Sequence, residues 1–394
     1  MPAEGQPFLI LHLVFFATEN LSAEQCVRLS VVVMRIFVAT MERIHASETR
    51  ALPMTTVQPR ATLDDVARLA GVSAKTVSRV FNQPEIVGTE TAQRVQAAAT
   101  RLRFRPNTLA QHLRRGGGTD TVGFVMGEFG NPFYYKVASG IEAEIAPHGH
   151  HLLLATTDDT AEGEARVVDA LLGQRVGALL IIPVADDQAY LEGERQLGTP
   201  VISIDRDATN VLADAIVLEN RRILHEATRR LLSLGHRRIG YVCNPSSVST
   251  QVERLAGYRT AMSEAGIEDT AAWCRLSDDR TERADTTVGE LLDSDDAPTA
   301  IITGNNRMTI GALRAMRARD DTHTALIGFD DFDTADIIGV SVITYDPVEI
   351  GRQAARLAME RMSDPAGPPR RIVLSTWIVE RGTGERPPHE RNAP

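Results

Sequence analysis

The sequence has few cysteines and no long apolar run. Three cysteines occur in 394 residues, at Cys26, Cys243 and Cys274, and their spacing matches no metal-binding motif. An odd number of cysteines suits a reduced cytoplasm. No apolar run reaches the ~18–20 residues that span a membrane. The apolar segment at residues 8–16 follows Glu4 with no Lys or Arg before it, which argues against a secretory signal.

Signatures of common catalytic sites are missing as well. The glycine run at residues 116–118 has no strand before it and no Gly-Lys-Ser/Thr after it, so it is not a phosphate-binding loop. No Gly-x-Ser-x-Gly motif occurs. His148, His150 and His151 lack an evident carboxylate partner, and we interpret them as a solvated turn, with a metal site as the alternative. The sequence therefore predicts no enzyme activity, no cofactor and no bound metal.

Charge is unevenly distributed along the chain. The formal net charge is −10, yet residues 57–118 hold ten Lys or Arg against four Asp or Glu. A basic segment in an acidic chain is typical of a nucleic-acid-binding module attached to a part that does not bind nucleic acid. The length of the chain predicts two or three domains.

Residues 61–82 read as two short helices joined by a tight turn. Ala67 is small at the point where two helices must approach closely, and Gly71 falls at the turn, where a positive φ is least costly. Thr62 and Ser73 can cap the two helix N-termini. The apolar face expected on the first helix consists of Leu63, Val66, Leu69 and Ala70.

The second of these helices has polar residues on its outer side. Val77 and Val80 face the first helix. The positions left facing outward are Ala74, Lys75, Ser78 and Arg79. An outward Lys and Arg on a second helix fit the major groove of DNA. The spacing predicts a DNA-binding helix-turn-helix, and an ordinary helical hairpin is the alternative.

A third helix is expected over residues 90–102, and it ends before Pro106 because proline disfavours helix in the residue that precedes it. Residues 108–115 form a segment shorter than the ~12–15 residues that an isolated helix needs in water. We therefore expect this segment to become helical only on DNA.

The stretches GVSAKTVSRVFN and RPNTLAQHLRR, with the third helix between them, resemble the headpiece and hinge of the LacI (lac-repressor) family of bacterial transcription regulators. The resemblance covers about residues 61–381. It implies a homodimer that places two recognition helices in successive major grooves of a near-palindromic operator. Lys75 and Arg79 would reach base edges or phosphates, and Ala74 a thymine methyl group.

The same resemblance implies that Leu113 wedges into the minor groove and bends the DNA, with support from Asn107 and Gln111. The implied DNA-binding residues are Thr62, Ser73, Ala74, Lys75, Thr76, Ser78, Arg79, Asn82, Asn107, Gln111 and Leu113.

From residue 121 onward, short β-rich runs alternate with amphipathic helical stretches. The expected strands are 122–126, 152–155, 178–182, 201–204, 239–242, 300–302 and 325–327. The expected helices are 134–146, 164–174, 221–234, 251–265 and 309–319, followed by a helix at 347–362 and a strand near 372–379. This alternation predicts an α/β fold with parallel sheets in two lobes and a ligand crevice at the strand ends.

This part resembles the periplasmic-binding-protein-like effector domain of the same family. We expect an all-α headpiece at 54–106, a hinge at 107–118, an effector-binding and dimerisation domain at 119–382, and a tail at 383–394. The tail lacks the heptads of a tetramerising coiled coil.

Polar residues follow several of the expected strands, at positions that line the effector cleft in the family. The candidates implied in this way are Asn131, Phe133, Asp205, Arg206, Arg254, Asn305 and Asp330. Carboxylates, an amide and guanidinium groups suit a polyhydroxylated ligand, because each hydroxyl both donates and accepts. Phe133 could stack on the apolar face of a sugar ring. We expect a sugar or a sugar derivative as the effector.

Each candidate also has a structural interpretation. Asn131 can belong to a turn that starts a helix, Arg254 to an ion pair, and Asp330 to a loop cap. Asp205 and Arg206 can form a surface ion pair, but we favour the cleft for both because adjacent residues do not face each other.

The pair Asn305-Asn306 departs from the family pattern, which commonly has an acidic residue after the asparagine. The departure either changes the class of ligand or removes a structural bond.

The leading function is a ligand-regulated transcription factor, a cytoplasmic, nucleoid-associated repressor in which effector binding changes lobe closure and so orders or disorders the hinge. A solute-binding protein for a transporter shares the large domain, but it needs export and gives no reason for residues 61–82. An enzyme on this scaffold needs a catalytic constellation that is missing from the sequence.

Residues 1–53 precede the resemblance. Two apolar runs in this stretch, at 8–16 and 31–38, have no partner domain large enough to bury them. We expect Met54 to be the physiological start, with the extension a mis-assigned upstream translation or a dispensable tail. An amphipathic regulatory or dimerising helix at 29–44 is the alternative.

Overall fold

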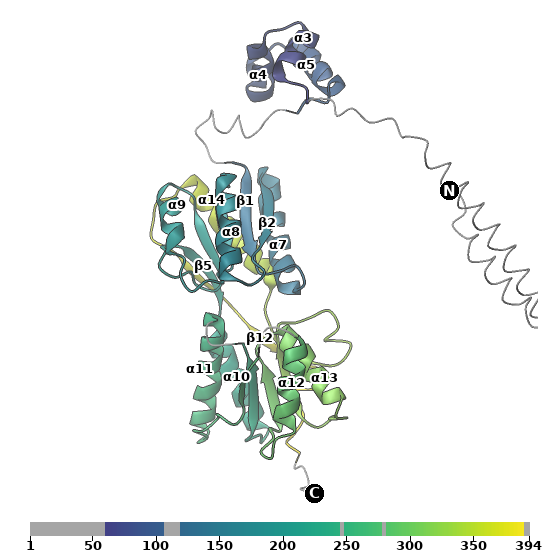
Figure 1. The fold of residues 1–394 in the computed structure, drawn as a ribbon, viewed down its shortest axis with the longest axis vertical. Coiled ribbons are helices and arrows are strands. Elements are labelled where there is room, and N and C mark those ends of the chain that lie inside the picture. Colours follow the sequence, from purple (N-terminus) through teal and green to yellow (C-terminus); the bar gives the residue numbers. More distant parts are fainter. Residues whose placement is uncertain (1–59, 106–118, 245–247, 278–280, 390–394) are drawn as a thin grey trace, which may run out of the picture. The chain divides into compact units, whose positions relative to one another are not determined.

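The computed structural model describes residues 60–105, 119–244, 248–277 and 281–389 (Figure 1). The chain forms two compact units that divide after Asn107. The described residues of the first unit, 60–105, form three short α-helices, and the second unit holds two lobes built on parallel sheets, which confirms the expected fold class. The extension at 1–53 and the hinge residues Asn107, Gln111 and Leu113 lie outside the described residues. Within the described ranges no helix is long and apolar enough to cross a membrane.

The three helices of the first unit begin and end where local chemistry requires. They are α3 (Leu63–Ala70), α4 (Ala74–Asn82) and α5 (Thr89–Arg101). The Thr62 side chain accepts from the Asp65 backbone N–H while the Asp65 carboxylate accepts from the Thr62 N–H, which forms a capping box at α3. Ser73 caps α4, and Gly71 has φ +66° in the turn.

One expectation about the first unit is wrong. Leu69 was placed on the apolar face of the first helix, but it is 43% exposed. The buried stripe of α3 consists of Val66, Ala67 and Ala70, because Ala67 allows the close helix approach and Leu69 lies off that stripe. Val77 and Val80 of α4 pack into this core as expected.

The second unit has two six-stranded sheets. The sheet of the first lobe has the order β11 (Arg371–Leu374), β5 (Asp214–Leu218), β4 (Val201–Asp205), β3 (Ala178–Ile181), β1 (Thr121–Met126) and β2 (His151–Thr156). The sheet of the second lobe has the order β12 (Trp377–Val379), β10 (Ser341–Thr344), β9 (Ala325–Phe329), β8 (Ala300–Thr303), β6 (Ile239–Cys243) and β7 (Cys274–Leu276). All neighbours pair in parallel except β12, which is antiparallel to β10.

Helices cover the sheets of both lobes (Figure 1). The first lobe contains α7 (Pro132–Ile145), α8 (Ala161–Gly173), α9 (Glu192–Gln196) and α14 (Pro347–Ser363). The second lobe contains α10 (Asn220–Ser233), α11 (Ser249–Glu264), α12 (Thr281–Leu292) and α13 (Asn306–Arg317). The packed fold also continues past residue 382, since the Thr383 hydroxyl donates to the Leu326 carbonyl of β9.

The chain crosses between the lobes three times, after β5, after β10 and after β11. The third crossing corrects the single strand expected near 372–379: β11 and β12 belong to different sheets, with Ser375 and Thr376 between them. Strands β5, β7 and β10 and helix α12 were also missed, because short or mixed segments carry little periodic signal.

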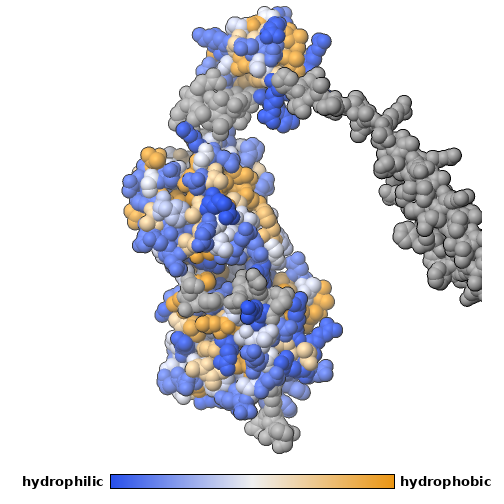
Figure 2. Space-filling model, viewed as in Figure 1, coloured by the Kyte–Doolittle hydropathy of each residue, from blue (hydrophilic) through white to orange (hydrophobic). Residues whose placement is uncertain are grey.

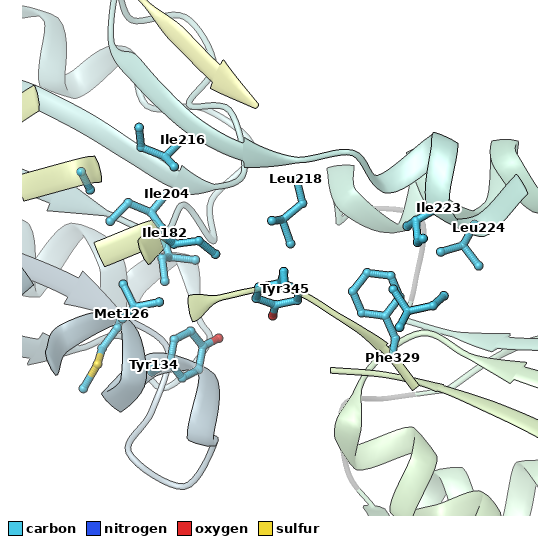
Figure 3. Packing of buried hydrophobic residues seen from close by; sticks show 14 of the residues in the cluster. Met126, Tyr134, Ile182, Ile204, Ile216, Leu218, Ile223, Leu224, Phe329 and Tyr345 are labelled. Atoms are coloured by element: carbon cyan, nitrogen blue, oxygen red, sulfur yellow. The ribbon is translucent and has the colours of Figure 1, made fainter. Parts of the chain in front are cut away.

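A continuous apolar cluster runs through both lobes. Figure 3 shows Leu218 and Tyr345 between the first-lobe residues Ile182 and Ile204 and the second-lobe residue Phe329. Leu218 ends β5 and Tyr345 follows β10, so two of the crossing segments are anchored in the core. The outer surface is mixed, with hydrophilic residues predominating on the face shown in Figure 2.

Helices α7 and α14 approach each other through glycines. A Cβ on Gly351 would lie 2.1 Å from the Val137 carbonyl oxygen, and a Cβ on Gly140 would lie 2.0 Å from the Val348 carbonyl oxygen. Both obstacles are backbone atoms, which a rotamer change cannot move away.

We expect Gly351→Ala to lower the free energy of unfolding of the second unit by about 1–3 kcal/mol, since the added methyl overpacks a backbone contact. The control is Gly173→Ala, where the new methyl meets nothing within 4 Å and a helical alanine is favoured over glycine. Urea denaturation followed by circular dichroism measures both. Equal midpoints for the two variants would contradict the close packing of α7 on α14.

Candidate functional site

Two pockets lie between the lobes of the second unit. One has a volume of about 240 Å³ and is lined by Phe133, Lys136, Asn306, Asp330, Asp331, Thr344, Tyr345, Pro347 and Val348. The other has a volume of about 200 Å³ and includes Asp205, Arg206, Asn220 and Thr250. Both pockets lie at the carboxyl ends of parallel strands, where ligands of open α/β folds bind.

Arg254 of α11 is buried, with 4% of its surface exposed. Its Nε donates to Asn220 Oδ1 at 2.7 Å and its Nη1 to the Gly304 carbonyl at 2.6 Å. The guanidinium lies over the Phe329 ring, 3.5 Å from the centroid. No carboxylate of the described residues lies within 4.0 Å of it, so the ion-pair alternative does not describe Arg254. A buried cation without a paired anion points to a binding role.

Asp330 follows β9, as the sequence suggested, and the Tyr345 hydroxyl donates to its Oδ1 at 2.7 Å. Burial raises the pKa of the Asp330 carboxyl above its ordinary value, and nearby Arg254 and the Tyr345 bond oppose that shift. The nearby Asp205 carboxylate raises the pKa further. Asp330 therefore lies among both donors and acceptors, and its hydroxyl partner Tyr345 lies outside its own loop.

Asp205 and Arg206 lie together at the end of β4. Arg206 Nη1 donates to the Pro183 carbonyl at 2.9 Å, and its Nε is buried without a hydrogen-bond partner among the described residues. The two side chains approach to 3.7 Å, so the expectation that these adjacent residues do not face each other is wrong. The reason is the backbone, because Asp205 has φ +65° and the strand ends there in a left-handed turn.

Asp330 has the same backbone conformation, with φ +66°. Left-handed backbone is uncommon outside glycine and is least costly for Asn and Asp. The two aspartates therefore occupy equivalent positions, one at the end of a strand in each lobe.

Asn131 and Phe133 lie at the start of α7. Asn131 is the N-cap and accepts from the Phe133 backbone N–H at 3.1 Å. It therefore belongs to a turn that starts a helix, which is the structural alternative given for it above. Its oxygen also accepts from Asn306 Nδ2 of the second lobe at 2.9 Å. The Phe133 ring lines the larger pocket and meets the Tyr345 ring edge-on, with centroids 6.0 Å apart.

Asn305 is the N-cap of α13, and its oxygen accepts from the Met308 backbone N–H at 2.9 Å. Its Nδ2 donates to Asn244 Oδ1 at 2.9 Å, across the ends of β8 and β6. Asn305 therefore links the ends of β8 and β6 in the second lobe, and it lines neither of the two pockets.

In the first unit, the outer side of α4 carries Lys75 and Arg79, both exposed. Ala74 is half-buried and packs against the headpiece core, so it is less outward than expected. Ser78 is also half-buried, and Asn82 Nδ2 donates to its carbonyl at 2.7 Å and its hydroxyl at 3.1 Å.

The remaining headpiece candidates have capping contacts. Thr62 and Ser73 cap α3 and α4, and the Thr76 hydroxyl lies 2.9 Å from the Ser73 hydroxyl. Asn107, Gln111 and Leu113 lie outside the described residues, so their roles stay predictions.

Sequence reasoning missed Tyr345 and Asn220, which line the pockets, and Asn244, which bonds Asn305. It also did not commit to Asn306. Tyr345 follows β10, and the signal that could have located it is the mostly β-branched run at 340–344 before Pro347. The cleft offers carboxylates, amides, a phenol, an aromatic face and guanidinium groups. This chemistry suits recognition of a small polyhydroxylated molecule. In the part of the chain that the structure describes, no three His, Cys, Asp or Glu side chains are placed to hold a metal ion.

Comparison with known families matches both units. Residues 119–374 match the family described as periplasmic binding proteins and sugar binding domain of the LacI family. Residues 62–107 match the bacterial regulatory proteins of the lacI family.

Individual relatives match over most of the chain. The transcriptional regulator CelR of Thermobifida fusca is 32% identical, covering 82% of this chain and 98% of that protein. The ribose operon repressor of Escherichia coli K12 is 29% identical, covering 82% of this chain and 99% of that protein. Among solved structures, the lac repressor dimer bound to operator and an anti-inducer matches with a TM-score of 0.73 and 25% identity, covering 83% of this chain and 99% of that one. The CelR–cellobiose complex matches with a TM-score of 0.61 and 29% identity, covering 82% of this chain and all of that one.

The raised pKa of Asp330 predicts a pH-dependent effect of Asp330→Asn. An acid whose pKa is raised by folding favours the folded state below its unfolded value and loses that contribution as the pH rises through the folded value. The variant should therefore gain stability relative to the parent chain as the pH rises above about 4, the ordinary pKa of an aspartate.

Urea denaturation of both proteins across this pH range provides the measurement. In a Tyr345→Phe background the gain should occur at higher pH, because the lost hydroxyl no longer lowers the pKa. A stability difference that stays constant with pH would contradict the assignment.

Proposed function

Because the chain belongs to the LacI family of bacterial regulatory proteins, we propose that it is a sequence-specific transcriptional repressor that binds a near-palindromic operator as a homodimer. A small sugar-like effector in the cleft of the second unit controls it. The protein acts in the cytoplasm, at the nucleoid, and has no catalytic role. The observation that carries the proposal is the combination, in one chain, of a helix-turn-helix with exposed Lys75 and Arg79 and a polar cleft whose residue Asn220 is bonded to buried Arg254.

The DNA-binding part of the proposal rests on the first unit. Lys75 and Arg79 project from α4 into solvent, and this helix follows the tight turn at Gly71 as a recognition helix does. Thr62, Ser73, Ala74, Thr76, Ser78 and Asn82 would support it or contact the backbone. Leu113 would bend the DNA at the minor groove, with Asn107 and Gln111 beside it.

The effector-binding part rests on the second unit. Asn131, Phe133, Asp205, Arg206, Arg254, Asn305 and Asp330 are the residues we propose to contact or frame the ligand. CelR was solved with cellobiose, and another relative is a ribose operon repressor. Cellobiose and D-ribose are therefore the first probes, and the ligand class we propose is a neutral sugar.

A solute-binding protein is the second interpretation of the large unit. It does not account for the match of residues 62–107 to the DNA-binding family. No observation on the described residues favours it over a regulator.

We expect Arg79→Ala to weaken operator binding by about 1–3 kcal/mol if the guanidinium reads a guanine, with the fold unchanged. The operator is obtained by selection from random DNA, and gel-shift titration at fixed salt measures the affinity. Arg94→Ala is the matched control, an exposed arginine on α5 instead of α4. Equal affinities for Arg79→Ala and the parent chain would remove Arg79 from the interface.

We expect Arg254→Ala to weaken sugar binding at least about tenfold, because it removes a buried charged donor. Operator binding should persist. Isothermal calorimetry with cellobiose and D-ribose measures the change, and Arg259→Ala on the exposed side of the same helix is the control. An unaltered Kd in Arg254→Ala would refute the role of Arg254, and sugar binding lost equally in the control would point to a nonspecific effect.

A further inference from the structure

Asn306 is the first residue of α13 and is almost fully buried, with 3% of its surface exposed. Its Nδ2 donates to Asn131 Oδ1 at 2.9 Å, which joins the second lobe to the first. The two residues stand at the N-termini of α13 and α7. One side-chain bond thus ties together two helices that belong to different lobes.

The polarity of this bond is dictated by the helix cap. Asn131 Oδ1 already accepts from the Phe133 backbone N–H at 3.1 Å, so Asn131 must present its oxygen to α13. The group that meets it must therefore be a donor. An asparagine at position 306 supplies that donor, whereas an ionised carboxylate has none and would place two acceptors against each other.

The other half of the Asn306 amide has no partner. Its Oδ1 is buried and accepts no hydrogen bond among the described residues. A buried acceptor without a donor costs free energy, so the bond to Asn131 is opposed by this cost within the empty cleft.

Two charged contacts accompany the amide bond across the same edge of the cleft. Glu128 of the first lobe pairs with Arg307, the residue after Asn306. Lys136 of α7 lies 3.2 Å from Asp333, which follows β9. These contacts exist only when the two lobes are close.

We propose that the Asn131–Asn306 bond is a latch that holds the cleft closed, and that asparagine at position 306, where the family commonly has an acid, is what permits it. The proposal rests on the proposed function only in taking this cleft as the effector site. The latch itself is a property of the sugar-free protein.

Two isosteric variants separate the bond from the charge that each introduces. Asn131→Asp keeps an acceptor for both Phe133 and Asn306, so the bond is retained and becomes charge-assisted. Asn306→Asp places a carboxylate against Asn131 Oδ1 and removes the hydrogen bond between the two side chains. Each variant adds one negative charge at the same contact. Asn306→Leu removes the donor without adding charge near Asp330, and it carries the test if Asn306→Asp does not fold.

The chain provides its own reporter of closure. It contains two lysines, Lys75 and Lys136, and Lys136 meets Asp333 across the cleft. The side chain of Lys136 is 33% exposed and that of Asp333 is 73% exposed, so a reagent can reach both. A water-soluble carbodiimide converts the Asp333 carboxyl into an O-acylisourea, and the Lys136 amine attacks its acyl carbon. The urea leaves and an amide joins the two lobes. Peptide mass spectrometry of the full-length, sugar-free protein measures the initial rate of this cross-link, and Lys136→Arg gives the background.

The expected result is a rate for Asn131→Asp at or above that of the parent chain, and a clearly lower rate for Asn306→Asp and Asn306→Leu. The closed-to-open ratio should differ by about tenfold between the two aspartate variants. Equal rates in all variants would overturn the latch. An equal fall in both aspartate variants would assign the effect to charge and would also overturn it. Because no sugar is present, the outcome is independent of the Arg254→Ala calorimetry.

Discussion

The three passages of the chain between the two lobes of the second unit are the constraint on which the rest of the structure depends. Neither lobe is a continuous piece of sequence, because α14 and β11 return to the first lobe after β10 has been built in the second. The carboxyl ends of the central strands in both sheets therefore meet at one cleft. Two of the crossings are held by Leu218 and Tyr345 in the apolar cluster that the lobes share.

The polar groups of the cleft follow from this arrangement. Asp205 and Asp330 each end a strand with a left-handed backbone, which turns both carboxyls toward the space between the lobes. Arg254 is held from the second lobe by Asn220 and the Gly304 carbonyl, and it acts on the nearby Asp330 carboxyl through space. Groups fixed in this way need little reorganisation when a ligand arrives, which lowers the entropic cost of binding.

Local features were predictable from the sequence, and features that depend on distant residues were not. The caps at Thr62 and Ser73 and the turn at Gly71 involve neighbours within four positions, so the helix-turn-helix could be recognised directly. The contact of Asn306 with Asn131 spans 175 positions and depends on how two lobes close. The periodicity of apolar residues along a sequence gives no information about a contact between two such distant side chains.

The misses in the cleft have equally physical causes. The segment at 372–379 looks like one strand because it is rich in β-branched and other apolar residues and contains no glycine or proline, yet the two halves pair with different sheets. Sequence reasoning does not find Tyr345 because β10, the strand before it, mixes the polar Ser341 and Thr344 with Val342 and Ile343 and gives no clear apolar run. Asp205 and Arg206 were expected to point apart, which holds for extended backbone but not at a positive φ.

The central claim is that occupancy of the cleft in the second unit is coupled to DNA binding by the first. Thermodynamic reciprocity tests it most directly. The Kd of the sugar is measured by calorimetry on the free protein and on the protein saturated with its selected operator, and the Kd of the operator is measured with and without sugar. The account predicts that both constants change, by the same factor. Equal sugar affinity in the free and the operator-bound protein would contradict it.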